Sequence, residues 1–159
     1  MSAAARKPTV GQPIPQFSLP AASGGSWKLA DAAGTKLVLY FYPKDMTSGC
    51  TLESQGFRDH YAAFRRAGTA IVGISRDGLK SHQKFKDKER LPFELLADEE
   101  EQVCRLFDVL KEKNMYGRKS LGIERSTFLL DGAGVLRREW RKVKVQGHVE
   151  EVLEAAKSL

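Results

Sequence analysis

Residues 36–53, with the sequence KLVLYFYPKDMTSGCTLE, hold the strongest indication of fold class in this chain. Positions 36–42 form a run dominated by apolar, β-branched and aromatic side chains, which predicts a strand buried on both faces. Pro43 ends this run, and after a polar loop to Gly49 a helix is expected to begin near Cys50. A second buried strand is expected at residues 70–74, and this alternation of strand, helix and strand indicates an α/β domain with parallel strand pairing.

Outward from this segment, the pattern predicts a mixed central sheet flanked by helices, with a β-hairpin at the N-terminal end. Asp131-Gly-Ala-Gly134, flanked by residues 126–130 and 135–140, predicts a second hairpin. Asp98 is expected to cap a helix, and residues 111–122, with mixed charge and two glycines, are expected to form a loop. The expected strands are 17–19, 26–29, 36–42, 70–74, 95–97, 126–130 and 135–140, and the expected helices are 50–66, 79–90, 99–109 and 148–158.

The size and composition suit a single folded domain. The chain has 159 residues, of which 42% are hydrophobic, and this content is enough for a sizeable core and argues against disorder. We assign residues 1–10 to an N-terminal arm and residues 11–159 to one domain. The longest apolar run, residues 37–43 with Pro43 counted, has seven residues, far below the ~18 that a membrane helix needs, so we expect no membrane association.

The two cysteines, Cys50 and Cys104, indicate a reducing compartment. They are too few for a secreted disulfide framework and are not spaced like a metal-binding knuckle. The first ten residues, MSAAARKPTV, lack the apolar core of a secretory signal. We therefore expect a cytoplasmic location.

The net charge of +6 first suggests an acidic partner such as nucleic acid. The excess is local, because residues 111–145 contain ten Lys or Arg and four acidic residues, while the remainder is balanced at sixteen of each. A nucleic-acid-binding module would need these cations on one face with exposed aromatic side chains among them. Many of the cations fall where the late hairpin is expected to face water. We therefore keep nucleic-acid binding only as an alternative.

Cys50 is the most informative single residue. In the first turn of a helix its sulfur would meet unpaired backbone N–H groups and the positive end of the helix dipole, which favour the thiolate. Its neighbours Ser48, Gly49 and Thr51 are small or hydroxylic, whereas a core cysteine has large apolar neighbours. Most intracellular cysteines are nevertheless inert core residues. The local pattern alone leaves both interpretations open.

The segment Pro43-Lys-Asp-Met-Thr47-Ser-Gly-Cys50 resembles the Pro-x-x-x-Thr/Ser-x-x-Cys signature of the peroxiredoxins. The wider sequence is similar to the bacterioferritin-comigratory (Q-type) branch, and the similarity runs in order from Gly11 onward. The resemblance implies a thioredoxin-like fold and a thioredoxin-dependent reductase for hydrogen peroxide and organic or alkyl hydroperoxides. The further matching segments are Val38–Asp45, Cys50–Glu53, Phe57–Asp59, Val72–Asp77, His82, Leu91–Phe93, Gly122–Phe128 and Gly147–His148.

The resemblance also assigns roles to individual residues. Cys50 would be the peroxidatic cysteine that becomes a sulfenic acid. Thr47 would hydrogen-bond the incoming peroxide, and Pro43 would shield the sulfur from bulk water. Arg125 matches the family arginine that contacts both sulfur and peroxide, and Glu53 is expected to hold it through a bidentate pair.

The sequence departs from much of this branch at the resolving cysteine. The two positions where relatives carry it are Gln55 and Lys86 here. Cys104 lies in a segment with the spacing of a buried helix face, so we favour a structural role for it and a one-cysteine cycle. An external thiol such as thioredoxin, glutaredoxin or glutathione would then reduce the sulfenic acid. The alternative is that Cys104 resolves it.

Other signals indicate little further chemistry. The three histidines, His60, His82 and His148, are isolated in the sequence, so we expect no metal and no cofactor. A thiol–disulfide reductase on the same fold would want Cys-x-x-Cys, and positions 47 and 53 are Thr and Glu. The resemblance favours a monomer.

Overall fold

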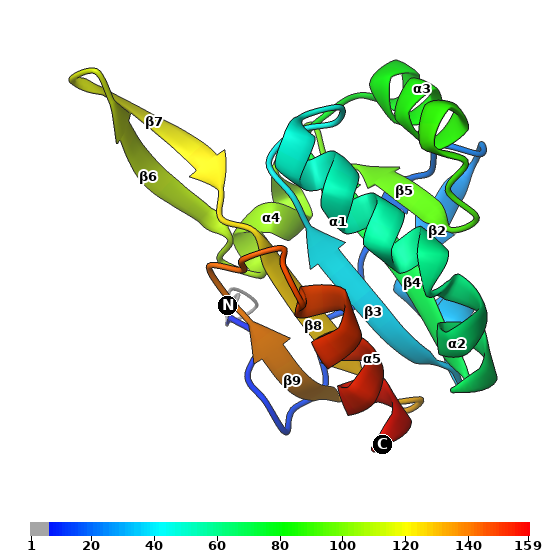
Figure 1. Ribbon diagram of the computed structural model, residues 1–159. Coiled ribbons are helices and arrows are strands. Elements are labelled where there is room, and N and C mark those ends of the chain that lie inside the picture. Colours follow the sequence, from blue (N-terminus) through cyan, green and yellow to red (C-terminus); the bar gives the residue numbers. More distant parts are fainter. Residues whose placement is uncertain (1–6) are drawn as a thin grey trace.

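A five-stranded mixed sheet forms the centre of the structure, a computed structural model that describes residues 7–159 (Figure 1). The strand order is β5-β4-β3-β8-β9. β3, β4 and β5 are parallel, whereas β8 is antiparallel to both β3 and β9. The elements are β1 (Ser18–Pro20), β2 (Ser26–Lys28), η2 (Leu29–Ala32), β3 (Lys36–Phe41), α1 (Ser48–Asp59), α2 (Tyr61–Arg66), β4 (Thr69–Ser75), α3 (Leu79–Glu89), β5 (Glu94–Ala97), α4 (Gln102–Leu106), β6 (Leu110–Met115), β7 (Arg118–Ile123), β8 (Ser126–Leu130), β9 (Leu136–Trp140) and α5 (His148–Lys157).

Strand β3 is buried on both faces, as its sequence predicts. Side chains alternate along a strand, so Leu39 and Phe41 belong to one apolar cluster while Val38 and Tyr40 belong to another. The sheet therefore separates two cores.

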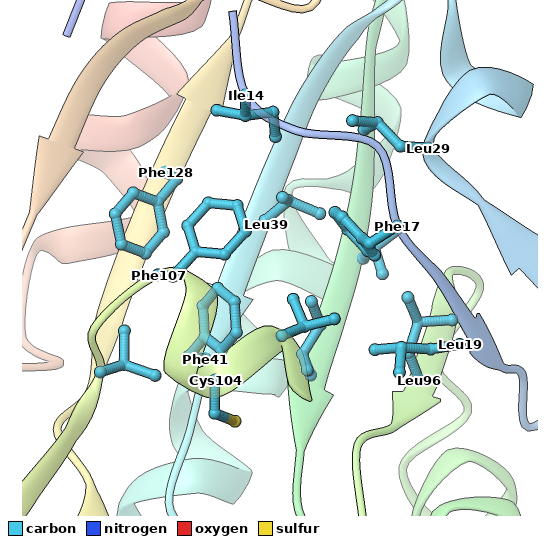
Figure 2. Packing of buried hydrophobic residues seen from close by; sticks show 14 of the residues in the cluster. Ile14, Phe17, Leu19, Leu29, Leu39, Phe41, Leu96, Cys104, Phe107 and Phe128 are labelled. Atoms are coloured by element: carbon cyan, nitrogen blue, oxygen red, sulfur yellow. The ribbon is translucent and has the colours of Figure 1, made fainter. Parts of the chain in front are cut away.

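Different elements cover the two faces. The cluster that contains Tyr40 is covered by α1, α2, α3 and α5, which contribute residues such as Phe57, Phe64, Phe85 and Val152. The cluster that contains Phe41 is covered by α4 and the N-terminal segment, with Phe107 packed between Phe41 and Phe128 (Figure 2). The predicted mixed sheet with helices on its faces and the N-terminal hairpin of β1 and β2 are thus confirmed.

The expected helix 50–66 is wrong in one respect, because it is two helices. α1 begins earlier than expected, at Ser48, and the helical geometry is interrupted at His60 before α2 begins. The carbonyl oxygen of Gly56 lies 3.1 Å from the backbone nitrogen of His60 and 2.9 Å from Nδ1 of its imidazole. The imidazole thus lies against the last turn of α1, where the backbone leaves helical geometry.

The expected helix 99–109 is also shorter than predicted, as α4 spans only Gln102–Leu106. The residue that precedes α4 is Glu101, in a left-handed conformation, so Asp98 is not the N-cap. Asp98 nevertheless contacts α4, because its Oδ2 accepts a hydrogen bond from the backbone N–H of Cys104 at 2.7 Å.

The loop predicted for residues 111–122 is wrong, since β6 and β7 form a two-stranded antiparallel hairpin there. Tyr116 and Gly117 make its turn, both with positive φ, as tight hairpin turns require. Most side chains of the two strands are exposed. Beyond the base of the hairpin, where Ile123 is buried, its strands are mostly exposed, so the alternation that identifies strands is missing. No helix within residues 7–159 is long and apolar enough to cross a membrane.

Candidate functional site

Cys50 lies in the first turn of α1, close to the point where β3 ends. Its side chain is buried, with a residue exposure of 1%. Thr47 precedes α1 and is exposed, and its hydroxyl donates to the carbonyl oxygen of Lys44 at 2.9 Å. Pro43 is half-buried at the start of the same loop. Cys50 thus lies in the same turn as the first backbone N–H groups of α1, which have no partner within the helix.

Arg125 reaches this sulfur from the segment between β7 and β8. Its Nη2 lies 3.5 Å from Sγ of Cys50, and its Nη1 donates to Oε1 of Glu53 at 2.7 Å. The expected bidentate pair with Glu53 is therefore wrong, because the two terminal guanidinium nitrogens contact different residues. A single planar cation bridges the carboxylate and the sulfur.

Gly49 makes this approach possible. A Cβ at this position would lie 3.0 Å from Nη2 of Arg125, closer than ordinary side-chain contacts. The glycine therefore leaves room for the guanidinium beside the first turn of α1.

The carboxylate that holds Arg125 is buried. Desolvation raises the pKa of Glu53 to about 7, although the positive charge of Arg125 opposes this shift. Burial disfavours the charge of Arg125, but Glu53 and Cys50 outweigh this effect and raise its pKa above the usual value. Oε2 of Glu53 has no hydrogen-bond partner among the described residues. The ionisation of Glu53 near neutral pH therefore changes the charge beside the Arg125 guanidinium.

A buried hydrogen-bond network holds the loop that precedes Cys50. Asp45 accepts hydrogen bonds from the hydroxyls of Tyr42 at 2.6 Å and Ser81 at 2.8 Å. Nδ1 of His82 lies 2.7 Å from Oδ2 of Asp45, and Nε2 lies 2.9 Å from the carbonyl oxygen of Leu96. The loop is thereby tied to α3 and to the end of β5. Sequence reasoning missed this role, because His82 has no partner close to it in the sequence.

Asp45, Asp77 and His82 bring their ligand atoms within 4.8 Å of one another. Their positions are explained by hydrogen bonds. Oδ2 of Asp77 accepts the backbone N–H of Asp45 at 2.9 Å and the hydroxyl of Ser75 at 2.6 Å. We therefore interpret this cluster as part of the network that fixes the loop.

Cys104 lies on the other side of the sheet from Cys50. It belongs to the cluster with Phe41, Phe107 and Phe128 (Figure 2). Cys50 belongs to the cluster with Tyr40. Burial raises the pKa of the Cys104 thiol, and the nearby Asp98 carboxylate adds to the shift. The two cysteines therefore pack into the clusters on opposite faces of the sheet.

Gln55 and Lys86, where the sequence resemblance leads one to expect a resolving cysteine, both make defined polar contacts. Nε2 of Gln55 donates to Oε1 of Glu89 at 2.7 Å. Nζ of Lys86 donates to the carbonyl oxygens of Leu91 and Phe93 at 2.8 and 2.7 Å. Both side chains therefore stabilise α3 and its surroundings.

The basic residues of the 111–145 segment do not share one environment. Arg141 donates to the carbonyl oxygens of Phe107 and Asp108, and Arg137 pairs with Asp131. Arg138 lies over the ring of Trp140. Three of the ten cations thus make separate contacts on and just after β9.

The comparison with protein families matches residues 10–139 to the model described as the AhpC/TSA family. "Putative peroxiredoxin bcp" from Coxiella burnetii is 51% identical over 144 residues, covering 91% of this chain and 95% of that protein. "Peroxiredoxin Bcp" from Bacillus subtilis is 48% identical over 150 residues, covering 94% and 96%.

Solved structures show the same similarity. A structure of the Xanthomonas campestris bacterioferritin comigratory protein, described as a trapped intermediate/ligand complex in a study of alkyl peroxide reduction, superposes with a TM-score of 0.86 at 49% identity. The superposition covers 89% of this chain and 90% of the Xanthomonas campestris chain. A mutant of Xylella fastidiosa PrxQ gives a TM-score of 0.91 at 38% identity, with coverage of 96% and 98%.

Proposed function

Because this chain belongs to the AhpC/TSA family and is a peroxiredoxin of the Bcp branch with a thioredoxin-like fold, we propose that Cys50 reduces hydrogen peroxide and organic hydroperoxides. The observation that carries the proposal is the position of Arg125, whose Nη2 lies 3.5 Å from Cys50 Sγ at the start of α1. A cation and the helix terminus together favour a thiolate.

In the first step the Cys50 thiolate attacks one peroxide oxygen. The O–O bond breaks, an S–O bond forms, and the leaving oxygen takes a proton to depart as water or an alcohol. Cysteine is oxidised to sulfenic acid, and the peroxide is reduced. Backbone N–H groups at the start of α1 and the guanidinium of Arg125 stabilise the negative charge that develops on the leaving oxygen.

Thr47 and Pro43 complete the proposed site. The Thr47 hydroxyl already donates to the Lys44 carbonyl, so its oxygen keeps lone pairs that accept a hydrogen bond from the peroxide. Pro43 limits the conformations of the loop and shields the sulfur from water. Glu53 acts through Arg125 by fixing the direction of the guanidinium.

In the second step an external thiol reduces the sulfenic acid. Its sulfur attacks the sulfur of Cys50, water leaves, and a mixed disulfide forms between the two. A second thiol then attacks the external sulfur of this mixed disulfide, which releases the Cys50 thiolate and joins the two external thiols in a disulfide. Thioredoxin, glutaredoxin and glutathione supply this chemistry. The position of Cys104 across the sheet supports the one-cysteine cycle, and resolution by Cys104 is the alternative.

Intact-mass measurement after one equivalent of peroxide tests the cycle. We expect the protein to gain one oxygen, because no second thiol lies on the same face of the sheet. Loss of two hydrogens would show an internal disulfide. Cys50→Ser is expected to abolish peroxide consumption with dithiothreitol, and Cys104→Ser to retain it. If Cys104→Ser lost thioredoxin-supported turnover but kept the first oxidation, Cys104 would be the resolving residue.

We also propose a cytoplasmic monomer that acts in antioxidant defence and redox homeostasis. Both cysteines are free thiols, which suits a reducing compartment. The large exposed apolar side chains among the described residues come from different segments of the chain: Val10, Met46, Leu52, Tyr116, Leu121 and Leu159.

A further inference from the structure

The β6–β7 hairpin projects from the body of the protein as a separate arm (Figure 1). Its strands, Leu110–Met115 and Arg118–Ile123, pair only with each other. Six strand residues at ~3.4 Å each give the arm a length of roughly 20 Å. The residues at its tip, Tyr116 and Gly117, are exposed, and Tyr116 is 99% accessible. A ribbon with both faces in water contributes little to the core.

The arm is basic. Its strands and turn contain four cations, Lys111, Lys113, Arg118 and Lys119, and one acid, Glu112. Lys119 lies 3.7 Å from Glu112, but both side chains are largely exposed, and such pairs are weak. The arm therefore presents net positive charge with an exposed aromatic side chain at its tip. Arginine and tyrosine are also enriched at the energetic centres of protein interfaces.

The base of the arm lies beside the candidate site. β7 ends at Ile123, two residues before Arg125, which contacts Cys50. The base is fixed, because Nη2 of Arg76 donates to the carbonyl oxygen of Leu121 at 3.1 Å. A protein large enough to cover the site from outside would therefore also meet the arm.

Since oxidised Cys50 needs an external thiol under the proposed function, we propose that the β6–β7 hairpin docks a protein thiol reductant with an acidic surface. The inference rests on that function and adds the chemistry of the partner. Charge complementarity favours this occupant, because a positive arm steers an acidic protein towards it. A second copy of this chain is disfavoured, since its net charge is +6.

The test reverses the charge at two exposed positions, with Arg118→Glu and Lys119→Glu combined. Arg118→Gln with Lys119→Gln serves as a milder variant that introduces no new like-charge pair with Glu112. The matched control is Arg65→Glu with Arg66→Glu, two exposed cations on α2, far from the hairpin (Figure 1). Far-ultraviolet circular dichroism checks that every variant is folded.

Three rates are measured for each protein: oxidation of Cys50 by hydrogen peroxide, turnover with dithiothreitol, and turnover with a thioredoxin of net negative charge. We expect the hairpin variants to raise the KM for the acidic thioredoxin roughly tenfold, with the charge-reversed pair above the neutral pair. The other two rates should stay within about twofold, because neither step uses the arm. Added salt should reduce the difference in KM.

An unchanged KM for the acidic thioredoxin in the charge-reversed variant would overturn the proposal. An equal rise in this KM in the α2 control variant would also overturn the proposal, because the effect would then depend on the net charge of the protein and not on the position of the cations. Hairpin-dependent dimerisation in gel filtration or a hairpin-dependent gel shift with duplex DNA, with the KM unchanged, would assign the arm to those occupants instead. Failure of the proposed function would look different, since the unmodified protein would then not be oxidised by peroxide at Cys50.

Discussion

Nη2 of Arg125 lies 3.5 Å from Sγ of Cys50, although the two residues are 75 positions apart in the chain. Cys50 is placed by the start of α1 and Arg125 by the segment that leads into β8. β3 and β8 are antiparallel neighbours in the sheet, so the C-terminal end of β3 and the start of β8 lie side by side at the same end of the sheet. The contact is therefore a consequence of strand order.

Replacing Arg125 with lysine should slow the first oxidation while leaving the fold intact. Lysine carries one charged nitrogen, which cannot contact Glu53 and Cys50 simultaneously in the way that the planar guanidinium does. We expect the second-order rate constant for hydrogen peroxide to fall by about two orders of magnitude, the usual cost of removing one donor to a transition-state charge. Stopped-flow measurement of Cys50 oxidation gives this constant. Arg137→Lys, at an exposed pair on β9, is the control and should not change it.

Glu53→Gln should remove a pH-dependent component of stability. Burial raises the pKa of Glu53 from 4.5 to about 7 in the folded state, so between these values the folded protein binds more protons than the unfolded chain. The free energy of unfolding of the original protein should therefore fall as the pH rises through this range, by on the order of 3 kcal/mol. Urea denaturation at pH 5 and pH 8 measures the difference.

The same pH series distinguishes charge from shape, because glutamine keeps the size of the side chain but does not titrate. A parallel slope of stability against pH in Glu53→Gln and in the original protein would assign the dependence to other groups. A loss of that slope, together with slower oxidation of Cys50 at pH 8, would support Glu53 as the residue that positions Arg125.

Gly49→Ala should separate stability from reactivity. Alanine suits a helix better than glycine by about 1 kcal/mol, so the substitution is not expected to destabilise α1. Its Cβ would, however, lie 3.0 Å from Nη2 of Arg125 and would displace the guanidinium. We expect an unchanged or higher melting temperature and at least a tenfold lower rate constant for peroxide. An unchanged rate would show that the guanidinium does not need its position beside Cys50.

Asp45→Asn should loosen the loop that precedes Cys50. The carboxylate accepts hydrogen bonds from Tyr42 and Ser81 and lies against His82, all buried or partly buried, and an amide cannot accept at both of its ends. We expect a loss of about 2–4 kcal/mol in the free energy of unfolding and slower oxidation of Cys50.

A matched control for Asp45→Asn is Asp59→Asn, since Asp59 makes an exposed pair with Arg58. This substitution should change the free energy of unfolding by less than about 0.5 kcal/mol. Equal effects of the two substitutions in urea denaturation would contradict the importance of the buried network.

Most of the sheet was predictable because its strands are strongly apolar. A continuous apolar run predicts β3, and the turn residues 131–134 predict β8 and β9 as the two strands of the last hairpin. The β6–β7 hairpin escaped this method, since strands exposed on both faces lack an apolar face. The break at His60 was also missed, because the apolar spacing of Phe57 and Phe64 continues across it.

The sequence by itself determined local features: where the buried strands run, that Cys50 stands at the start of a helix, and that this chain is similar to the peroxiredoxins. Only the tertiary structure decided which distant residues meet. Strand order brings Arg125 to Cys50, and the alternation of side chains along β3 leaves Cys104 in the opposite core. The physical reason is that periodicity reports which face of an element is buried, whereas contacts between elements depend on how the strands pair.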